Sequence, residues 1–136
     1  SRVMTILRKK ATALMIKYFC PLMAKDERSI FATVSAKVGS ISDNFLGGWY
    51  SYRASKAALN QIIKTSSIEQ KRLNKNLIMV SVHPGTVKTK LSTPFIGKKK
   101  VQTPVESANK IIDLLENVSL DDSGLFLDYN NNKIPF

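Results

Sequence analysis

The stretch LIMVSVHP, residues 77–84, is the clearest strand of the chain and sets its class of fold. It is a short, unbroken apolar run rich in branched side chains, which is typical of a strand covered on both faces of a sheet. It stops at Pro84-Gly85, a pair that ends strands and begins turns. A strand of this kind predicts a parallel sheet with helices packed on its faces.

Helix and strand patterns alternate on both sides of this run. SIFATVSA, residues 29–36, predicts a second short strand covered on both faces, and GLFLDY, residues 124–129, predicts a third. Helices are expected over 4–24, 50–73 and 103–118. The resulting order of helix, strand, helix, strand, helix, strand predicts an α/β fold with a parallel, doubly wound sheet.

The two outer helices carry the clearest local patterns. The helix over 103–118 should begin at Thr103, because this residue can cap it and Glu106 stands three positions later. In the first helix the apolar residues recur at the spacing of one helical stripe, which predicts a single buried face. The members of that face are Ala11, Leu14, Met15, Tyr18, Phe19 and Leu22.

Composition narrows the class of protein. At 136 residues the chain is expected to form a single domain over 1–136. The net charge is +11, yet the lysines are scattered and their two short clusters, at 8–10 and 98–100, contain no aromatic residue, so no specific nucleic-acid partner is expected. No apolar run approaches the roughly 20 residues of a membrane helix, and no leader is apparent. The single cysteine, Cys20, fits a reducing, cytoplasmic compartment.

GGWYSYRASKAALN, residues 47–60, contains a tyrosine and a lysine four positions apart, Tyr52 and Lys56. On a helix this spacing puts both side chains on one face. An ammonium beside a phenol favours the phenolate, and a phenol so placed can exchange a proton with a carbonyl or an alcohol. The spacing alone is weak evidence, because Tyr129 and Lys133 share it in a segment where no helix is expected. Position favours Tyr52, whose helix follows a glycine-rich loop at the end of a buried strand.

The chain contains SIFATVSAKVGS, then YSYRASKAALN, then MVSVHPGTVKTKL. These three motifs, in this order, resemble the short-chain dehydrogenase/reductase family, and their sequences are similar to those of its C-factor and Sniffer carbonyl-reductase branch. The resemblance implies the second half of a Rossmann-like fold and an oxidoreductase that reduces carbonyls or oxidises alcohols with NAD or NADP. It implies Tyr52 as general acid and base, with Lys56 tuning the phenol and binding the nicotinamide ribose.

The resemblance also implies a loop that faces the nicotinamide. Pro84 and Gly85 would shape its turn, Val87 would pack beside the ring, and Thr89 would bond the carboxamide or the diphosphate. His83 is expected to be a strand-end histidine with a satisfied hydrogen bond. No metal is implied.

The family's carbonyl-polarising serine has no direct match. The count back from Tyr52 lands on Ala36, which has no donor. Ser35 is the first choice to replace it and Ser40, in the loop that follows, the second. Because a strand alternates its faces, the shift by one position turns the Ser35 hydroxyl elsewhere. The family's helix asparagine is likewise missing from residues 7–9.

The nucleotide-binding first half of such proteins has no counterpart. None of the six glycines forms the glycine-rich phosphate turn. Only contacts to the nicotinamide half of the cofactor are therefore expected, with weak binding. The first interpretation is the catalytic half of an NAD(P)-dependent oxidoreductase acting on a small carbonyl compound or alcohol. The alternative is an impaired remnant that serves as a signalling or interaction module or has no function. Because the matching helices commonly build a dimer interface in the family, the resemblance also implies pairing with a second copy through helices 4–24 and 50–73.

Overall fold

The computed structural model describes the backbone of residues 2–87 and 101–136, and the side chains of these ranges from Lys10 onward. The helices are α1 (Arg2–Phe19), α2 (Tyr50–Lys71) and α4 (Pro104–Asn117), and the strands are β1 (Ser29–Val34), β2 (Leu77–His83) and β3 (Phe126–Asp128). Three single turns of 3₁₀ helix join them, η1 (Cys20–Leu22), η2 (Lys37–Gly39) and η3 (Leu120–Asp122). Among the described residues, none of the helices is long and apolar enough to span a bilayer.

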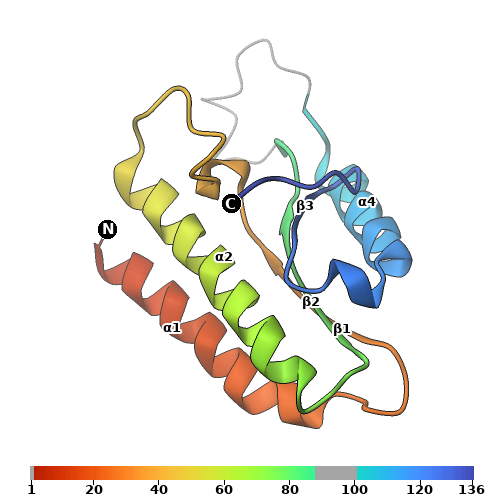
Figure 1. Cartoon of the computed structure of the whole chain (residues 1–136). Helices are drawn as coiled ribbons and strands as arrows, with labels where there is room; N and C mark the ends of the chain where they lie inside the picture. The colour runs from red at the N-terminus through yellow and green to blue at the C-terminus, as the bar shows by residue number, and fades with distance from the viewer. Residues whose placement is uncertain (1, 88–100) are drawn as a thin grey trace.

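The three strands form one parallel sheet in the order β1-β2-β3. Helices α1 and α2 lie side by side on one face of this sheet, and α4 covers the other (Figure 1). The predicted α/β class and the parallel pairing are therefore confirmed. The carboxyl ends of the three strands lie at the same end of the sheet, which is where parallel sheets of this kind bind their ligands.

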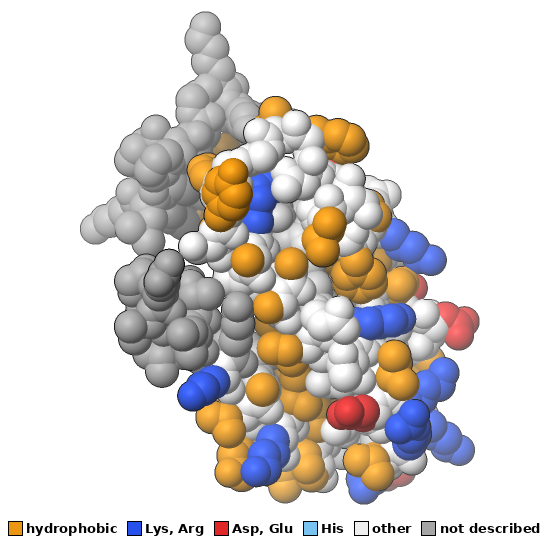
Figure 2. Space-filling model, turned by 60° about the vertical axis from the view of Figure 1, so that its left-hand side comes forward, with side chains coloured by type: hydrophobic (Ala, Val, Ile, Leu, Met, Phe, Trp, Pro, Cys, Tyr) orange, Lys and Arg blue, Asp and Glu red, His pale blue; other side chains and the backbone are white. Residues whose placement is uncertain are grey.

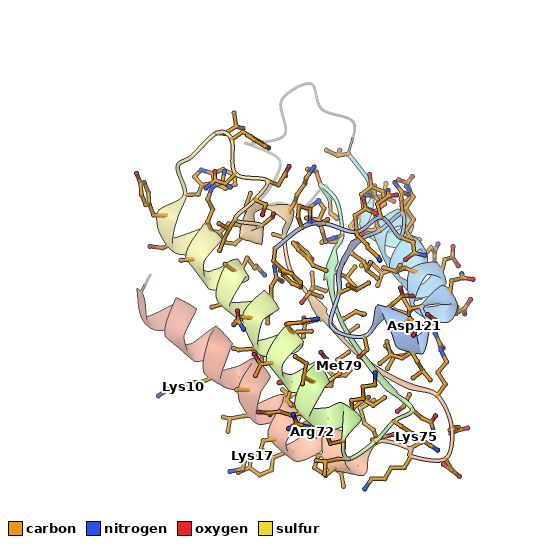
Figure 3. All side chains as sticks on the ribbon, in the orientation of Figure 1. Lys10, Lys17, Arg72, Lys75, Met79 and Asp121 are labelled. Carbon is orange, nitrogen blue, oxygen red and sulfur yellow. The ribbon has the colours of Figure 1, made fainter. Side chains whose placement is uncertain are left out.

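The middle strand β2 is buried along its length, as its sequence predicts. Its side chains alternate between two apolar clusters, because successive residues of a strand point to opposite faces. Met79 packs with Ile63 of α2 and Ile16 of α1, and Figure 3 shows it between the sheet and these helices. Val80 packs on the opposite face against Leu114 of α4.

Helix α4 has well-defined ends. The Thr103 hydroxyl accepts a hydrogen bond from the Glu106 N–H, and the Glu106 carboxylate accepts one from the Thr103 N–H, each at 3.2 Å. The predicted capping box is thus confirmed. At the other end, the Arg28 guanidinium donates to the carbonyls of Leu115 and Val118, both at 2.6 Å. These bonds satisfy terminal carbonyls and place a positive charge at the negative end of the helix dipole.

The predicted buried face of the first helix is wrong. Helix α1 buries Ile16, and η1 buries Cys20, so the buried stripe runs beside the predicted one. The apolar side chains of the predicted stripe lie on the surface, where Leu14 is 50% and Leu22 79% exposed. Figure 2, with the α1 and α2 side turned forward, shows hydrophobic patches between lysine and arginine side chains on this surface.

The first strand is also less covered than its sequence suggests. Phe31 and Ile30 are partly buried against the two clusters, but Val34 is 57% exposed. The reason is that β1 pairs with β2 along one edge, and no other described strand lies on its second edge. The strand predicted over 124–129 is shorter, Phe126–Asp128.

Candidate functional site

Tyr52 and Lys56 lie on one face of α2, close to its first turn. The Lys56 ammonium nitrogen is 5.8 Å from the centroid of the Tyr52 ring. The Tyr52 side chain remains 43% exposed, and the Trp49 ring meets it edge-on with 6.1 Å between centroids. The two side chains are therefore adjacent, and the Tyr52 side chain is accessible to solvent.

The chain reaches α2 through a turn that few residues can adopt. Gly47, Gly48 and Trp49 have positive φ angles of 67°, 71° and 53°. Glycine takes such angles without strain, whereas tryptophan does so at a cost. This turn starts α2 at Tyr50, so that Tyr52 falls in the first turn of the helix.

Two contacts fix Lys56 from outside its helix. Its ammonium donates a hydrogen bond of 3.3 Å to the carbonyl of Val34, the last residue of β1. The turn η2 lies against its backbone, since a Cβ placed on Gly39 would sit 2.8 Å from the Lys56 Cβ. The end of β1 and the turn that follows therefore hold the lysine.

The two candidate serines are both buried and hydrogen-bonded. The Ser35 hydroxyl donates to Oδ1 of Asn60 at 2.8 Å, and its N–H donates to the carbonyl of Val82 at 2.7 Å. The Ser40 hydroxyl accepts from the N–H of Asp43 at 3.0 Å. Asn60 was not expected at the site from sequence. The available indication was its position one turn after Lys56, on the same face of the helix.

The turn after β2 is built by residues from the start of α4. The Pro84 carbonyl accepts from the Gln102 side-chain amide at 3.2 Å and from the Ser107 hydroxyl at 3.3 Å. Gly85 has φ of 77°, and a Cβ there would overlap the Gln102 amide and the Tyr129 ring. Val87 pairs with Gln102 in a short β-bridge. Thr89 and residues 90–100 lie outside the described part of the chain.

His83 ends β2 and is hydrogen-bonded, as expected. Its Nδ1 accepts from the N–H of Lys37 at 3.1 Å, which leaves the proton of the neutral ring on Nε2. Burial lowers the pKa of His83, Asp128 opposes this, and Lys37 adds to it. The ring lines a cavity of about 370 Å³ at the carboxyl end of the sheet. The other residues around that cavity are Lys37, Asp43, Asp128, Tyr129, Asn132, Lys133, Ile134 and Pro135.

Tyr129 and Lys133 are not a second pair of the same kind. They follow β3 in turns rather than in a helix, as expected, and Lys133 forms a bridge with Leu127. The structure thus separates two sequence patterns of identical spacing.

Known proteins resemble the chain in sequence and in structure. It is 30% identical over 131 residues to an uncharacterised oxidoreductase of Schizosaccharomyces pombe, covering 87% of this chain and 51% of the relative. The carbonyl reductase Sniffer of D. melanogaster has a TM-score of 0.75 at 26% identity, covering 98% of this chain and 53% of Sniffer. A Burkholderia multivorans structure described as a short-chain dehydrogenase/reductase with bound NADP has a TM-score of 0.70 at 29% identity, covering 89% and 49%. No protein-family model matches the chain.

These likenesses extend over most of the chain. The chain spans about half the length of the curated relatives that it matches. Sequence and backbone similarity point to the same kind of enzyme, and they agree with the order of the three motifs. The chain therefore belongs to the short-chain dehydrogenase/reductase family.

Proposed function

We propose that this chain carries the proton-transfer half of an NAD(P)-dependent oxidoreductase that interconverts a small carbonyl compound and its alcohol. The observation that carries the proposal is the Lys56 ammonium, 5.8 Å from the ring of the half-exposed Tyr52 on one face of α2. Family membership supplies the reaction class, and the Tyr52–Lys56 geometry supplies the group that handles the proton.

The residues present fit the nicotinamide half of the cofactor. When bound, the nicotinamide supplies a hydride to the carbonyl carbon or takes one from the alcohol. The ammonium of Lys56 carries N–H donors suited to ribose hydroxyls. The space beside Gly85, in contrast, is filled by the Gln102 amide and the Tyr129 ring. In this proposal Val87 packs beside the ring, and Thr89, which lies outside the described residues, is assigned from sequence to the carboxamide or the diphosphate.

Tyr52 acts as the general acid and base. In reduction its hydroxyl gives a proton to the carbonyl oxygen, and in oxidation its phenolate takes one from the alcohol. The hydrogen bond to the substrate oxygen is assigned from sequence to Ser35, with Ser40 second. Ser35 would have to release Asn60 to make that bond.

The first test is cofactor binding to the purified chain. Trp49 is the only tryptophan and touches Tyr52, so nicotinamide binding should quench its fluorescence. We expect saturable quenching by NADPH or NADH. Tyr52→Phe should still bind, whereas Lys56→Gln should bind more weakly. An absence of quenching at about 1 mM cofactor, where a binding free energy near −4 kcal/mol suffices, would count against the proposal.

The second test is turnover of small aldehydes and ketones with the cofactor that binds. Tyr52→Phe should lower kcat by roughly 10²–10⁴-fold, because it removes the proton donor. Turnover that survives this change would refute the acid–base assignment. The alternative of a signalling or interaction remnant is not favoured by the similarity to oxidoreductases.

A further inference from the structure

A buried polar contact joins α2 to the end of β1, one helical turn after Lys56. Oδ1 of Asn60 accepts a hydrogen bond of 2.8 Å from the Ser35 hydroxyl. Asn60 is 2% exposed and Ser35 is 3% exposed. Helix α2 thus makes two hydrogen bonds to consecutive residues at the end of β1. Lys56 bonds to Val34, and Asn60 bonds to Ser35.

The geometry of one peptide bond links these two contacts. The Val34 carbonyl and the Ser35 N–H belong to the same planar, trans peptide group and point in opposite directions. The Ser35 N–H donates to the carbonyl of Val82 in β2 at 2.7 Å. The Val34 carbonyl must therefore point away from β2, toward the Lys56 ammonium. Whatever fixes Ser35 also fixes the acceptor that holds the lysine.

Packing alone does not explain an asparagine at position 60. Its Nδ2 is buried and has no hydrogen-bond partner among the described residues. Leaving a buried donor unpaired costs free energy, and an apolar residue of similar size would avoid that cost. A buried group kept at a cost to stability is expected where a site needs it.

We infer that Asn60 is a positioning residue, which clamps Ser35 so that the Val34 carbonyl holds the Lys56 ammonium at the site. Ser35 then acts through the lysine, and this role replaces the substrate contact that the sequence assigns to it. The inference rests on the proposed function, because that function gives Lys56 its role. The clamp itself is a property of the folded chain and can be measured without turnover.

The test measures how fast each lysine is acetylated by an N-hydroxysulfosuccinimide ester, followed by peptide mass spectrometry. In the wild-type chain Lys56 should react more slowly than the exposed Lys71 on the same helix. Asn60→Leu and Ser35→Ala should each speed acetylation of Lys56 about two- to tenfold, the factor that corresponds to one lost hydrogen bond. Ser35→Thr keeps a hydroxyl and should retain the wild-type rate.

Two controls separate a local clamp from general loosening. Gln61→Ala changes the next residue, which is exposed and bonds only to Thr65 among the described contacts, and should leave the Lys56 rate unchanged. Lys71 should react at its wild-type rate in every variant. If the Lys56 rate is unchanged in both Asn60→Leu and Ser35→Ala, or rises only together with that of Lys71, the inference is overturned.

The double variant Ser35→Ala/Asn60→Leu distinguishes the two roles for Ser35. If Ser35 acts only through Asn60, the double change should affect Lys56 acetylation and cofactor affinity no more than either single change. If Ser35→Ala lowers kcat more than Asn60→Leu does, the positioning role is overturned and Ser35 is restored as the hydrogen-bond donor to the substrate. Cofactor titration of the same proteins reports on the proposed function separately. A chain that binds no cofactor but shows the acetylation pattern refutes the function and supports the clamp.

Discussion

Gly39 lacks a side chain where the turn η2 meets α2. A Cβ at this position would lie 2.8 Å from the Lys56 Cβ and 2.9 Å from the Lys56 carbonyl carbon. The second atom belongs to the helix backbone, which cannot swing aside. Gly39→Ala should therefore lower the free energy of unfolding by about 1–3 kcal/mol, as overpacking usually does. Urea denaturation measures it, with the exposed Ser51→Ala as a control expected within about 0.5 kcal/mol of wild type.

His83 makes the stability of the chain depend on pH. Burial lowers its pKa in the folded state, whereas the unfolded chain takes up the proton at about pH 6.5. Below that pH the unfolded state holds more protons, so the free energy of unfolding should fall as pH drops from 6.5. The slope for one proton cannot exceed about 1.4 kcal/mol per pH unit. Above about pH 6.5 both states are neutral and the contribution is complete.

Urea denaturation between about pH 7.5 and 5, above the range of most carboxylates, measures this slope. The charged side chains that line the cavity together with the His83 ring are those of Lys37, Asp43, Asp128 and Lys133. His83→Asn keeps an acceptor near the position of Nδ1 for the Lys37 N–H but has no titrating group. Because His83 is the only histidine, this variant should show little slope in the same window. An equal slope in both proteins would exclude His83 as its source.

Helix α4 depends on the residues at its first turn. Thr103→Ala removes one acceptor of the capping box and should cost about 0.5–2 kcal/mol of unfolding free energy. Glu106→Gln preserves the reciprocal pair, since glutamine also serves at that position, and should stay near wild type. Denaturation of both variants in urea compares them. A loss of similar size in both would show that the Glu106 charge near the helix dipole stabilises this end as much as the box does.

Local patterns predict some elements of this molecule better than others. The capping box of α4 and the buried strand β2 were predictable because each depends on neighbouring residues or on a short apolar run. The buried face of α1 was not, because a stripe of apolar residues shows that a surface is apolar and not what covers it. Ile16 is buried and Leu14 exposed two positions apart. Only the packing of α1 against α2 and the sheet decides which of these two side chains is buried.

The site was predictable to the extent that it lies on one helix. Tyr52 and Lys56 are four positions apart, and helix geometry brings them together wherever that helix lies. The contacts of Lys56 with Val34 and of Asn60 with Ser35 join segments more than twenty residues apart. No spacing rule connects such segments, so these contacts emerge only from the fold.

The surface of the folded chain leaves much apolar area to be covered. On α1 and η1 the side chains of Leu14, Met15, Tyr18, Phe19 and Leu22 are between 48% and 79% exposed. Ile68 of the neighbouring helix α2 is 51% exposed. Exposed apolar area of this kind marks an interaction surface. Helices α1 and α2 are adjacent, so a second copy related by a two-fold axis would place four helices together.

We propose that the chain forms such a homodimer and expect sedimentation equilibrium to show it. Leu14→Glu and Phe19→Glu should each raise the dissociation constant at least about tenfold, because each puts a charge into an apolar contact. Salt should favour the dimer, since a net charge of +11 makes two copies repel and ions screen that repulsion. Ile112→Glu is the matched control, because Ile112 is 53% exposed on α4, across the sheet from this surface. A chain that stays monomeric at about 0.5 M salt, or a control that weakens association equally, would rule out this interface.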